Sequence, residues 1–275
     1  MRTARATYRQ SPLKKRRGKL RALLLCGIAI FVLAALFLAV RPHEAVVEHT
    51  AIEDARPSVN KQASGKSPAV SFNKKRYSIA DPSSLWVIVN KKRPLSPKDY
   101  TPSLAVSPVA LRLSSSNGEM HMRPEAANAL ETLFAGAKAD GLELMLASGY
   151  RSYSTQVSVY GAEVKNYGQT QADRESARPG YSEHQTGWAA DVEPASRKCE
   201  VAQCFASTPE GIWLAANAYK YGFIIRYPLD KTSVTGYDYE PWHIRYVGSE
   251  LAGEMRIQHV QTLEEFFGLP AAPAY

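Results

Sequence analysis

Apolar residues recur at helical spacing in several stretches of the chain. The positions from Ala126 to Ala137 repeat every three or four residues after Pro124, which suits the first turn of a helix, and the pattern stops near Asp140. The same spacing predicts a second helix over 154–167 and a third over 210–221. Further helical segments are expected between 249 and 267.

Short apolar runs predict strands between these helices. They lie at 142–147, 187–192, 223–226 and 242–247, and the run Ser84–Asn90 indicates a buried strand or a short helix. Helices and strands alternate in no strict β-α-β order. The fold class is therefore expected to be α+β, with a small, mostly antiparallel sheet flanked by helices.

The first forty residues follow a different pattern. Ala22–Val40 is an uncharged apolar stretch whose nineteen residues would form a helix about 28 Å long, close to the thickness of a bilayer core. We therefore predict a single transmembrane helix in front of the folded domain. A cleaved signal peptide is the alternative, but its apolar core is normally about 7–15 residues long, and Leu38–Pro42 is a poor cleavage site.

The distribution of charge defines the remaining segments. Residues 1–21 contain nine of the 34 basic residues and no acid, so this tail is expected to stay in the cytoplasm while everything after Arg41 is exported. The remaining 25 basic residues face 26 acidic ones, and such a near-neutral body argues against a nucleic-acid partner. Residues 41–75 lack lasting apolar periodicity and are assigned as a flexible linker, which leaves 76–270 as the folded domain.

Two of the three cysteines are consistent with export. Cys199 and Cys204 are separated by four residues and are predicted to form a small disulfide loop outside the cytoplasm. Cys26 lies within the predicted span.

Side chains that can bind metals cluster in two segments, Ser182–Asp191 and Glu240–His243. His184 and Asp191 would be about 10 Å apart in an unbroken helix and about 23 Å apart in a strand, so neither could place them on one ion. A chain reversal at Thr186 and Gly187 would bring them together. Pro241 disfavours helix at Glu240, so a bend there is required if Glu240 and His243 share a site.

His184, Asp191 and His243 would supply two nitrogen ligands and one oxygen ligand and leave a fourth position for water. That number of protein ligands is typical of a catalytic zinc site, and we expect one Zn²⁺ ion. Glu240 would remain beside the ion as a free carboxylate that can accept a proton from the water.

These motifs resemble the signature of the VanY-type D-alanyl-D-alanine carboxypeptidases, zinc peptidases of the bacterial cell wall that are related to the hedgehog and lysostaphin-type folds. The similarity extends over about 84–246. It rests on His184-x6-Asp191 and Glu240-x-x-His243, together with Val89-Asn90-Lys91, Ser148-Gly-Tyr-Arg151-Ser with Gln156, and Ala177-Arg178-Pro-Gly180 before Ser182.

The resemblance implies a role for each matching residue. His184, Asp191 and His243 bind zinc, Glu240 is the general base, and Arg151 faces the carbonyl or the terminal carboxylate of the substrate. Ser148, Gln156 and Ser182 match positions that line the substrate pocket, although Gln156 could instead face solvent. Glu183 and Glu193 are interpreted as groups that are solvated or that support the ligands indirectly.

The sequence thus predicts a zinc DD-carboxypeptidase that acts on peptidoglycan stem peptides, anchored in the bacterial cytoplasmic membrane with its catalytic domain in the periplasm or outside the cell. The alternatives are an LD-carboxypeptidase, a peptidoglycan endopeptidase and a non-catalytic wall-binding module. The sequence makes no prediction of the oligomeric state.

Overall fold

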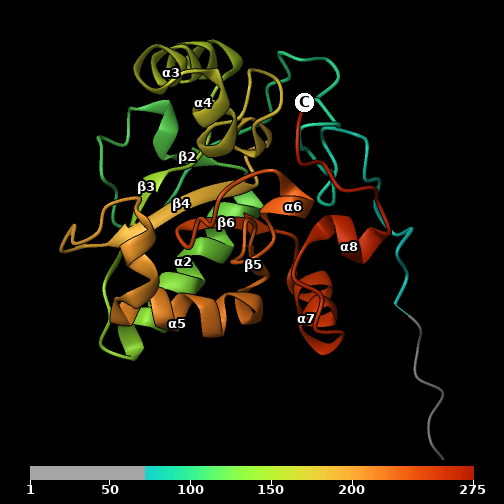
Figure 1. Ribbon diagram of the computed structural model, residues 1–275. Coiled ribbons are helices and arrows are strands. Elements are labelled where there is room, and N and C mark those ends of the chain that lie inside the picture. The colour runs from blue at the N-terminus through green and yellow to red at the C-terminus, as the bar shows by residue number, and fades with distance from the viewer. Residues whose placement is uncertain (1–71) are drawn as a thin grey trace, which may run out of the picture. The chain divides into compact units, whose positions relative to one another are not determined.

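A four-stranded antiparallel sheet, in the order β3-β4-β6-β5, organises residues 72–275, the part of the chain that the computed structural model describes (Figure 1). Its strands are β3 (Leu144–Ser148), β4 (Ala189–Pro194), β5 (Phe223–Ile225) and β6 (His243–Tyr246), and a separate hairpin pairs β1 (Ala105–Val106) with β2 (His121–Met122). The helices are α2 (Pro124–Ala139), α3 (Tyr153–Tyr167), α4 (Gln169–Glu175), α5 (Pro209–Asn217), α6 (Thr232–Thr235), α7 (Ser249–Ile257) and α8 (Leu263–Phe267).

The two faces of the sheet differ in character. Val192 on β4 and Ile244 on β6 join the main apolar core together with Leu130 and Leu133 of α2. Because side chains alternate along a strand, the neighbouring residues of β4 and β6 point to the opposite face. In Figure 1, α2 and α5 lie on one side of the sheet and α3 and α4 on the other.

The predicted fold class is confirmed. The described residues form an α+β fold in which small antiparallel sheets are flanked by helices. The helix predicted after Pro124 ends at Ala139, and the helix predicted over 154–167 begins one residue earlier, at Tyr153. That second helix lies at the surface, with Val157 47% exposed, and the short helix α4 that follows it was not predicted.

The segment Ser84–Asn90 is buried as predicted, but it forms neither a strand nor a helix apart from an isolated bridge at Asn90. Arginine side chains take the place of a neighbouring strand. Arg245 donates through Nη2 to the carbonyls of Leu85 and Val87, both at 2.9 Å. Since these hydrogen bonds satisfy the buried carbonyls, the segment needs no ladder partner.

Packing extends past both ends of the predicted domain, 76–270. Phe72 stacks on Trp86 with the ring centroids 5.4 Å apart, and it meets Phe266 edge-on at 5.5 Å. At the other end, the backbone N–H of Arg178 donates to the Tyr275 hydroxyl at 2.7 Å. The predicted span and residues 41–71 of the predicted linker lie outside the described residues. Within 72–275, no helix is both long and apolar enough to cross a membrane.

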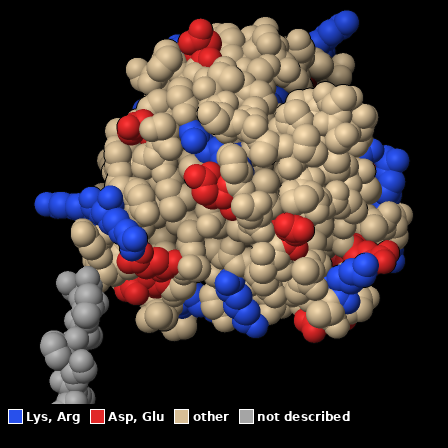
Figure 2. All heavy atoms as spheres, turned by 180° about the vertical axis from the view of Figure 1, so that it is seen from behind, with Lys and Arg blue, Asp and Glu red and all other residues tan. Residues whose placement is uncertain are grey.

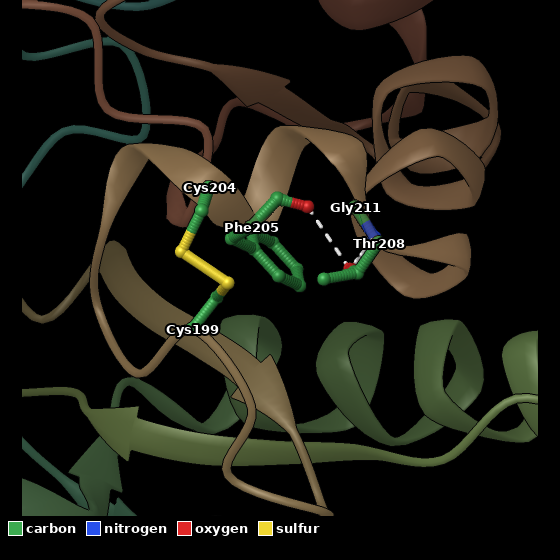
Figure 3. The surroundings of a disulfide bond; sticks show 5 residues. All are labelled: Cys199, Cys204, Phe205, Thr208 and Gly211. Carbon is green, nitrogen blue, oxygen red and sulfur yellow. Dashed lines mark hydrogen bonds between the residues drawn. A yellow bond between two sulfur atoms is a disulfide. The ribbon is translucent and has the colours of Figure 1, made fainter. Parts of the chain in front are cut away.

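The predicted disulfide between Cys199 and Cys204 is present (Figure 3). Phe205 follows it directly and is fully buried in the main core. Thr208 then caps α5, because its Oγ1 accepts the backbone N–H of Gly211 at 3.1 Å. The bridge therefore closes a loop that is anchored at its end by the core and by the start of α5.

Charged side chains of both signs are scattered over a mostly uncharged surface. Figure 2 shows lysines and arginines interspersed with aspartates and glutamates over one face. This mixture matches the near-neutral balance of the chain after its basic first 21 residues.

Candidate metal centre and substrate cleft

The turn that joins His184 to Asp191 is the reversal predicted at Thr186 and Gly187. A 3-10 helix, Glu183–Thr186, ends at Gly187, whose φ of 74° lies in the left-handed region. A Cβ atom at this position would also lie 3.1 Å from side-chain carbons of Arg123 and Leu104. The chain then returns as β4 and carries Asp191 back toward His184.

A second turn positions His243. Pro241 and Trp242 form the predicted bend, and the backbone N–H of His243 donates to the Glu240 carbonyl at 3.2 Å. His243 then begins β6, where it pairs directly with Asp191 of β4. The sheet register thus brings together residues that are 52 positions apart in the sequence.

His184, Asp191 and His243 converge on one point. One ligand atom from each lies within 4.8 Å of the other two, and all three residues are buried. The Asp191 carboxylate lies between the two imidazoles, with Oδ2 3.3 Å from His184 Nε2 and Oδ1 3.1 Å from His243 Nδ1. The rings themselves are nearly perpendicular, with their centroids 4.8 Å apart.

The partner of His184 selects the nitrogen that faces the site. Its Nδ1 lies 2.6 Å from the carbonyl oxygen of Gly149, so Nδ1–H donates there and Nε2 presents its lone pair to the centre. Position 149 requires glycine, because a Cβ there would lie only 2.5 Å from the His121 carbonyl oxygen. The site therefore uses Nε2 of His184 but Nδ1 of His243.

Charge and burial set the protonation of these groups. Burial lowers the pKa of His184, so that imidazole is neutral. Burial acts in the same sense on His243, but the hydrogen bond to Asp191 and the nearby carboxylates of Glu183 and Glu240 outweigh it and raise the pKa of His243 to about 9. Asp191 is buried too, yet the two histidines hold the pKa of its carboxyl well below the usual range.

Glu240 lies beside the three candidate ligands but is not one of them. Its Oε2 is 3.7 Å from His243 Nδ1. Burial, reinforced by the nearby Asp191 charge and opposed by His243, raises the pKa of Glu240 to about 8. A carboxyl group with a pKa near the working pH is suited to both accepting and returning a proton.

Arg151 extends the site toward the substrate cleft. Its Nη1 donates to Gln156 Oε1 and its Nη2 to Ser148 Oγ, both at 3.2 Å, while Nη2 lies 3.7 Å from Asp191 Oδ2. Gln156 does not face solvent; it is fully buried and donates through Nε2 to the Ala177 carbonyl at 2.6 Å. Gln156 and Ser148 thus orient the guanidinium.

These groups open onto a cleft of about 600 Å³. Ser182, which was predicted to line the pocket, lies in its wall together with the metal-site residues. The outer wall combines α3 and α4 with the disulfide loop and the segment before β6, and includes Val159, Glu163, Glu175, Val201, Gln203, Tyr237, Asp238 and Tyr239. The cleft is large enough for a short peptide.

Glu183 and Glu193, for which the sequence left two alternatives, are both buried. Glu183 pairs with Arg226 and Arg245, and its Oε2 lies 3.7 Å from His243 Nε2. Glu193 pairs with Arg112. A signal for the first cluster was present in the sequence, because Arg226 and Arg245 are charged residues within runs predicted as apolar strands, and such charges need buried partners.

The donor set fits a divalent transition metal. It combines two imidazole nitrogens with one carboxylate oxygen, and Asp191 is ionised. His243 presents Nδ1 to the centre, because Nδ1 lies 3.1 Å from Asp191 Oδ1. Its Nε2, on the far side of the ring, has no hydrogen-bond partner within 3.5 Å among the described residues. Three protein ligands would leave a fourth coordination position for water, as in catalytic zinc sites.

Comparison with known proteins shows which family the chain belongs to. Residues 119–249 match the family model described as VanY, D-alanyl-D-alanine carboxypeptidase. A D-alanyl-D-alanine carboxypeptidase of Enterococcus faecalis is 33% identical over 270 residues, which cover 92% of each chain. The chain belongs to the VanY family of D-alanyl-D-alanine carboxypeptidases.

Two solved structures are also similar. The LD-carboxypeptidase LdcB is 44% identical, with a TM-score of 0.64, and the match covers 68% of this chain and 87% of that one. The vancomycin-resistance D,D-pentapeptidase VanY, solved as a variant in complex with Zn(II), is 34% identical with a TM-score of 0.55, and the match covers 68% and 99% of the two chains.

Proposed function

We propose that this protein is a zinc-dependent D-alanyl-D-alanine carboxypeptidase that removes the terminal D-alanine from peptidoglycan stem peptides. The observation that carries the proposal is the position of Glu240, a buried free carboxylate beside three converging ligands. A purely structural zinc site is closed by four protein ligands and needs no base. This arrangement favours a hydrolase over a non-catalytic wall-binding module.

His184, Asp191 and His243 would hold the zinc ion. When bound, zinc lowers the pKa of water to about 7 and polarises a carbonyl group. Glu240 accepts the proton of the attacking water while the water oxygen bonds to the scissile carbonyl carbon. Glu240 then passes this proton to the departing amine of D-alanine as the C–N bond breaks.

Arg151 binds the carboxylate at the end of the peptide. A guanidinium offers two parallel donors that match the two oxygens of a carboxylate, and Gln156 and Ser148 hold it in place. A group that recognises a free carboxylate selects the last peptide bond, so the enzyme acts as a carboxypeptidase rather than an endopeptidase.

The zinc assignment is supported by the donor set and by the Zn(II) complex of the similar VanY D,D-pentapeptidase. The D,D specificity is supported by the family model and by the Enterococcus faecalis relative. A specific observation also favours a second candidate, an LD-carboxypeptidase that acts on the tetrapeptide. LdcB, an LD-carboxypeptidase at 44% identity, is more similar in sequence than the D,D-pentapeptidase VanY at 34%.

The test is an assay of residues 67–275, which form a unit of their own, with defined stem peptides. Zinc-loaded protein should release D-alanine from the pentapeptide, and a chelator should abolish the release. Cleavage of the tetrapeptide alone would replace the D,D assignment with the LD one. Cleavage of neither peptide would contradict both.

We further propose that Ala22–Val40 anchors the domain on the outer side of the bacterial cytoplasmic membrane. The support is the apolar stretch itself, the nine basic residues before it and the disulfide after it. Labelling intact cells with a membrane-impermeant thiol reagent after reduction should modify Cys199 and Cys204. Protection of both until the cells are lysed would contradict this topology.

A further inference from the structure

Two buried polar atoms near the metal centre lack hydrogen-bond partners within 3.5 Å among residues 72–275, and they face each other. They are Oε2 of Glu183 and Nε2 of His243. The two atoms are 3.7 Å apart, and both side chains are almost completely shielded from solvent. Since unpaired buried polar groups are costly, a small movement that closes this gap would satisfy both.

The other oxygen of Glu183 is already fixed. Its Oε1 accepts hydrogen bonds from Arg226 Nε at 2.8 Å and from Arg245 Nη1 at 3.0 Å. All three side chains are fully buried. The carboxylate is therefore held from one side and presents Oε2 to His243.

Arg226 is held in turn by a residue of α8. Arg226 donates to Glu264 through Nη1 at 3.0 Å and through Nη2 at 2.7 Å, and Asn90 Nδ2 donates to the same carboxylate at 2.9 Å. Two arginines balance two glutamates, so the cluster is neutral. Glu264 lies after residue 249, where the match to the family model ends.

Stability alone does not account for such a cluster, because buried ion pairs contribute little more to folding than apolar residues of the same volume. Its geometry instead serves the metal ligand. A histidine that binds a metal through one nitrogen usually donates the other N–H to a carboxylate, which fixes the ring and increases its basicity. Nδ1 of His243 faces Asp191, so Nε2 is the nitrogen left to donate.

We infer that Glu183 is a positioning residue of the metal centre: it accepts the His243 Nε2–H and directs Nδ1 toward the metal, while Arg226, itself paired with Glu264 of α8, holds its carboxylate. The inference rests on the proposed zinc site. It gives Glu183 a defined role where the sequence left two alternatives open, and it adds Glu264, which lies outside the residues matched by the family model.

The test uses zinc affinity, measured by competition with a chromophoric chelator, on the purified domain. Glu183→Gln keeps the shape of the side chain and removes its charge, and zinc affinity should fall about tenfold to a hundredfold. Glu193→Gln is the matched control, because Glu193 is also fully buried and ion-paired but contacts neither histidine. Thermal unfolding of each metal-free variant measures any general loss of stability.

A second pair of variants tests the connection to α8 and does not depend on whether Glu183→Gln folds. Glu264→Gln should lower zinc affinity about threefold. Arg226 would then have Glu183 as its remaining carboxylate partner, and the stronger pairing would make Glu183 a weaker acceptor for His243. Glu265→Gln, on the same helix, should leave the affinity unchanged because Glu265 pairs with the partly exposed Lys231. Nitrogen-15 spectra of the zinc-loaded wild type should show His243 protonated at Nε2.

The outcomes separate this inference from the proposed function. If the wild type binds zinc but Glu183→Gln and Glu264→Gln bind it as tightly as their controls, the positioning role is wrong and the zinc site stands. A His243 that binds the metal through Nε2 would also overturn the inference. If the wild type binds no zinc, the proposed function fails and the inference with it.

Discussion

Asp191 and His243 are directly opposite each other on β4 and β6, and His243 Nδ1 lies 3.1 Å from Asp191 Oδ1. Two of the three ligands are therefore set by the register of the sheet. A slip of one residue in either strand would turn its ligand toward the apolar core, so the metal centre depends on the packing of Val192 and Ile244 on the other face.

Replacement of Glu240 by Gln should abolish most of the turnover while zinc remains bound. The loss in kcat is expected to be about a hundredfold to ten-thousandfold, the contribution typical of a general acid or base. Release of D-alanine and zinc content should be measured on the same sample. Full activity with zinc bound would show that another group accepts the proton.

Replacement of Arg151 by Lys keeps the positive charge but removes the two parallel donors. We expect kcat/KM to fall about tenfold to a hundredfold, because hydrogen bonds to charged groups contribute about 1.5–3 kcal/mol. Arg197→Lys is the control, since Arg197 is exposed and pairs with Glu200. Equal activity of both variants would exclude Arg151 from substrate binding.

Gln156 should act on the substrate through Arg151. Gln156→Leu removes the acceptor 3.2 Å from Arg151 Nη1, so KM should rise several-fold while zinc affinity stays the same. In a double mutant with Arg151→Lys the two effects should be less than additive, since the residues share one interaction. Independent, additive effects would indicate that Gln156 has a separate role.

The stability of the metal-free protein should fall as the pH rises from about 6.5 to 9. The folded state raises the pKa of Glu240 from 4.5 to about 8 and that of His243 from 6.5 to about 9. Both groups then bind protons more tightly when folded, so their contribution is complete below the unfolded pKa values and is lost as the pH passes the folded ones.

Zinc should reverse this dependence, because a metal-bound histidine must be neutral and protons compete with the metal at low pH. Thermal unfolding with saturating zinc and with a chelator, followed from pH 6 to 9, gives the difference in Tm. We expect the difference to widen as the pH rises. A constant or narrowing difference would contradict the assigned protonation of the site.

The disulfide should contribute both to stability and to the shape of the cleft. Removing it with Cys199→Ser and Cys204→Ser frees a loop with a sequence separation of 5, which should cost about 2 kcal/mol. Cys199 and Val201 have φ values of 61° and 40°, which are unfavourable for residues other than glycine, and Val201 lines the cleft. KM should therefore rise with little change in zinc affinity. An unchanged Tm and KM would show that the bridge serves neither purpose.

Local chemistry made part of the site predictable from the sequence. Gly187 and Pro241 are residues whose backbone preferences require a turn, and the structure has turns at both positions. The convergence of His184, Asp191 and His243 followed from those turns and from the kinds of ligand that zinc prefers. Their spacing alone could not give the register between β4 and β6, because it depends on strands about fifty residues apart.

The features that were missed involve long-range contacts of charged side chains. The apolar run Ser84–Asn90 predicted burial correctly, but its carbonyls are satisfied by Arg245, which no periodicity can reveal. The sequence left open whether Glu183 is solvated or supports the ligands, because its partners Arg226 and Arg245 come from distant segments of the chain. The hydrophobic pattern predicts which segments are buried, but not which side chain forms a hydrogen bond with each buried polar group.

Titration of the metal-free enzyme with zinc, with D-alanine release measured at each step, tests the central claim most directly. Activity should rise in proportion to added zinc, reach its plateau at one equivalent, and be absent at every zinc concentration in His243→Ala. Release of D-alanine by the chelated enzyme, or by His243→Ala at the wild-type rate, would contradict the account.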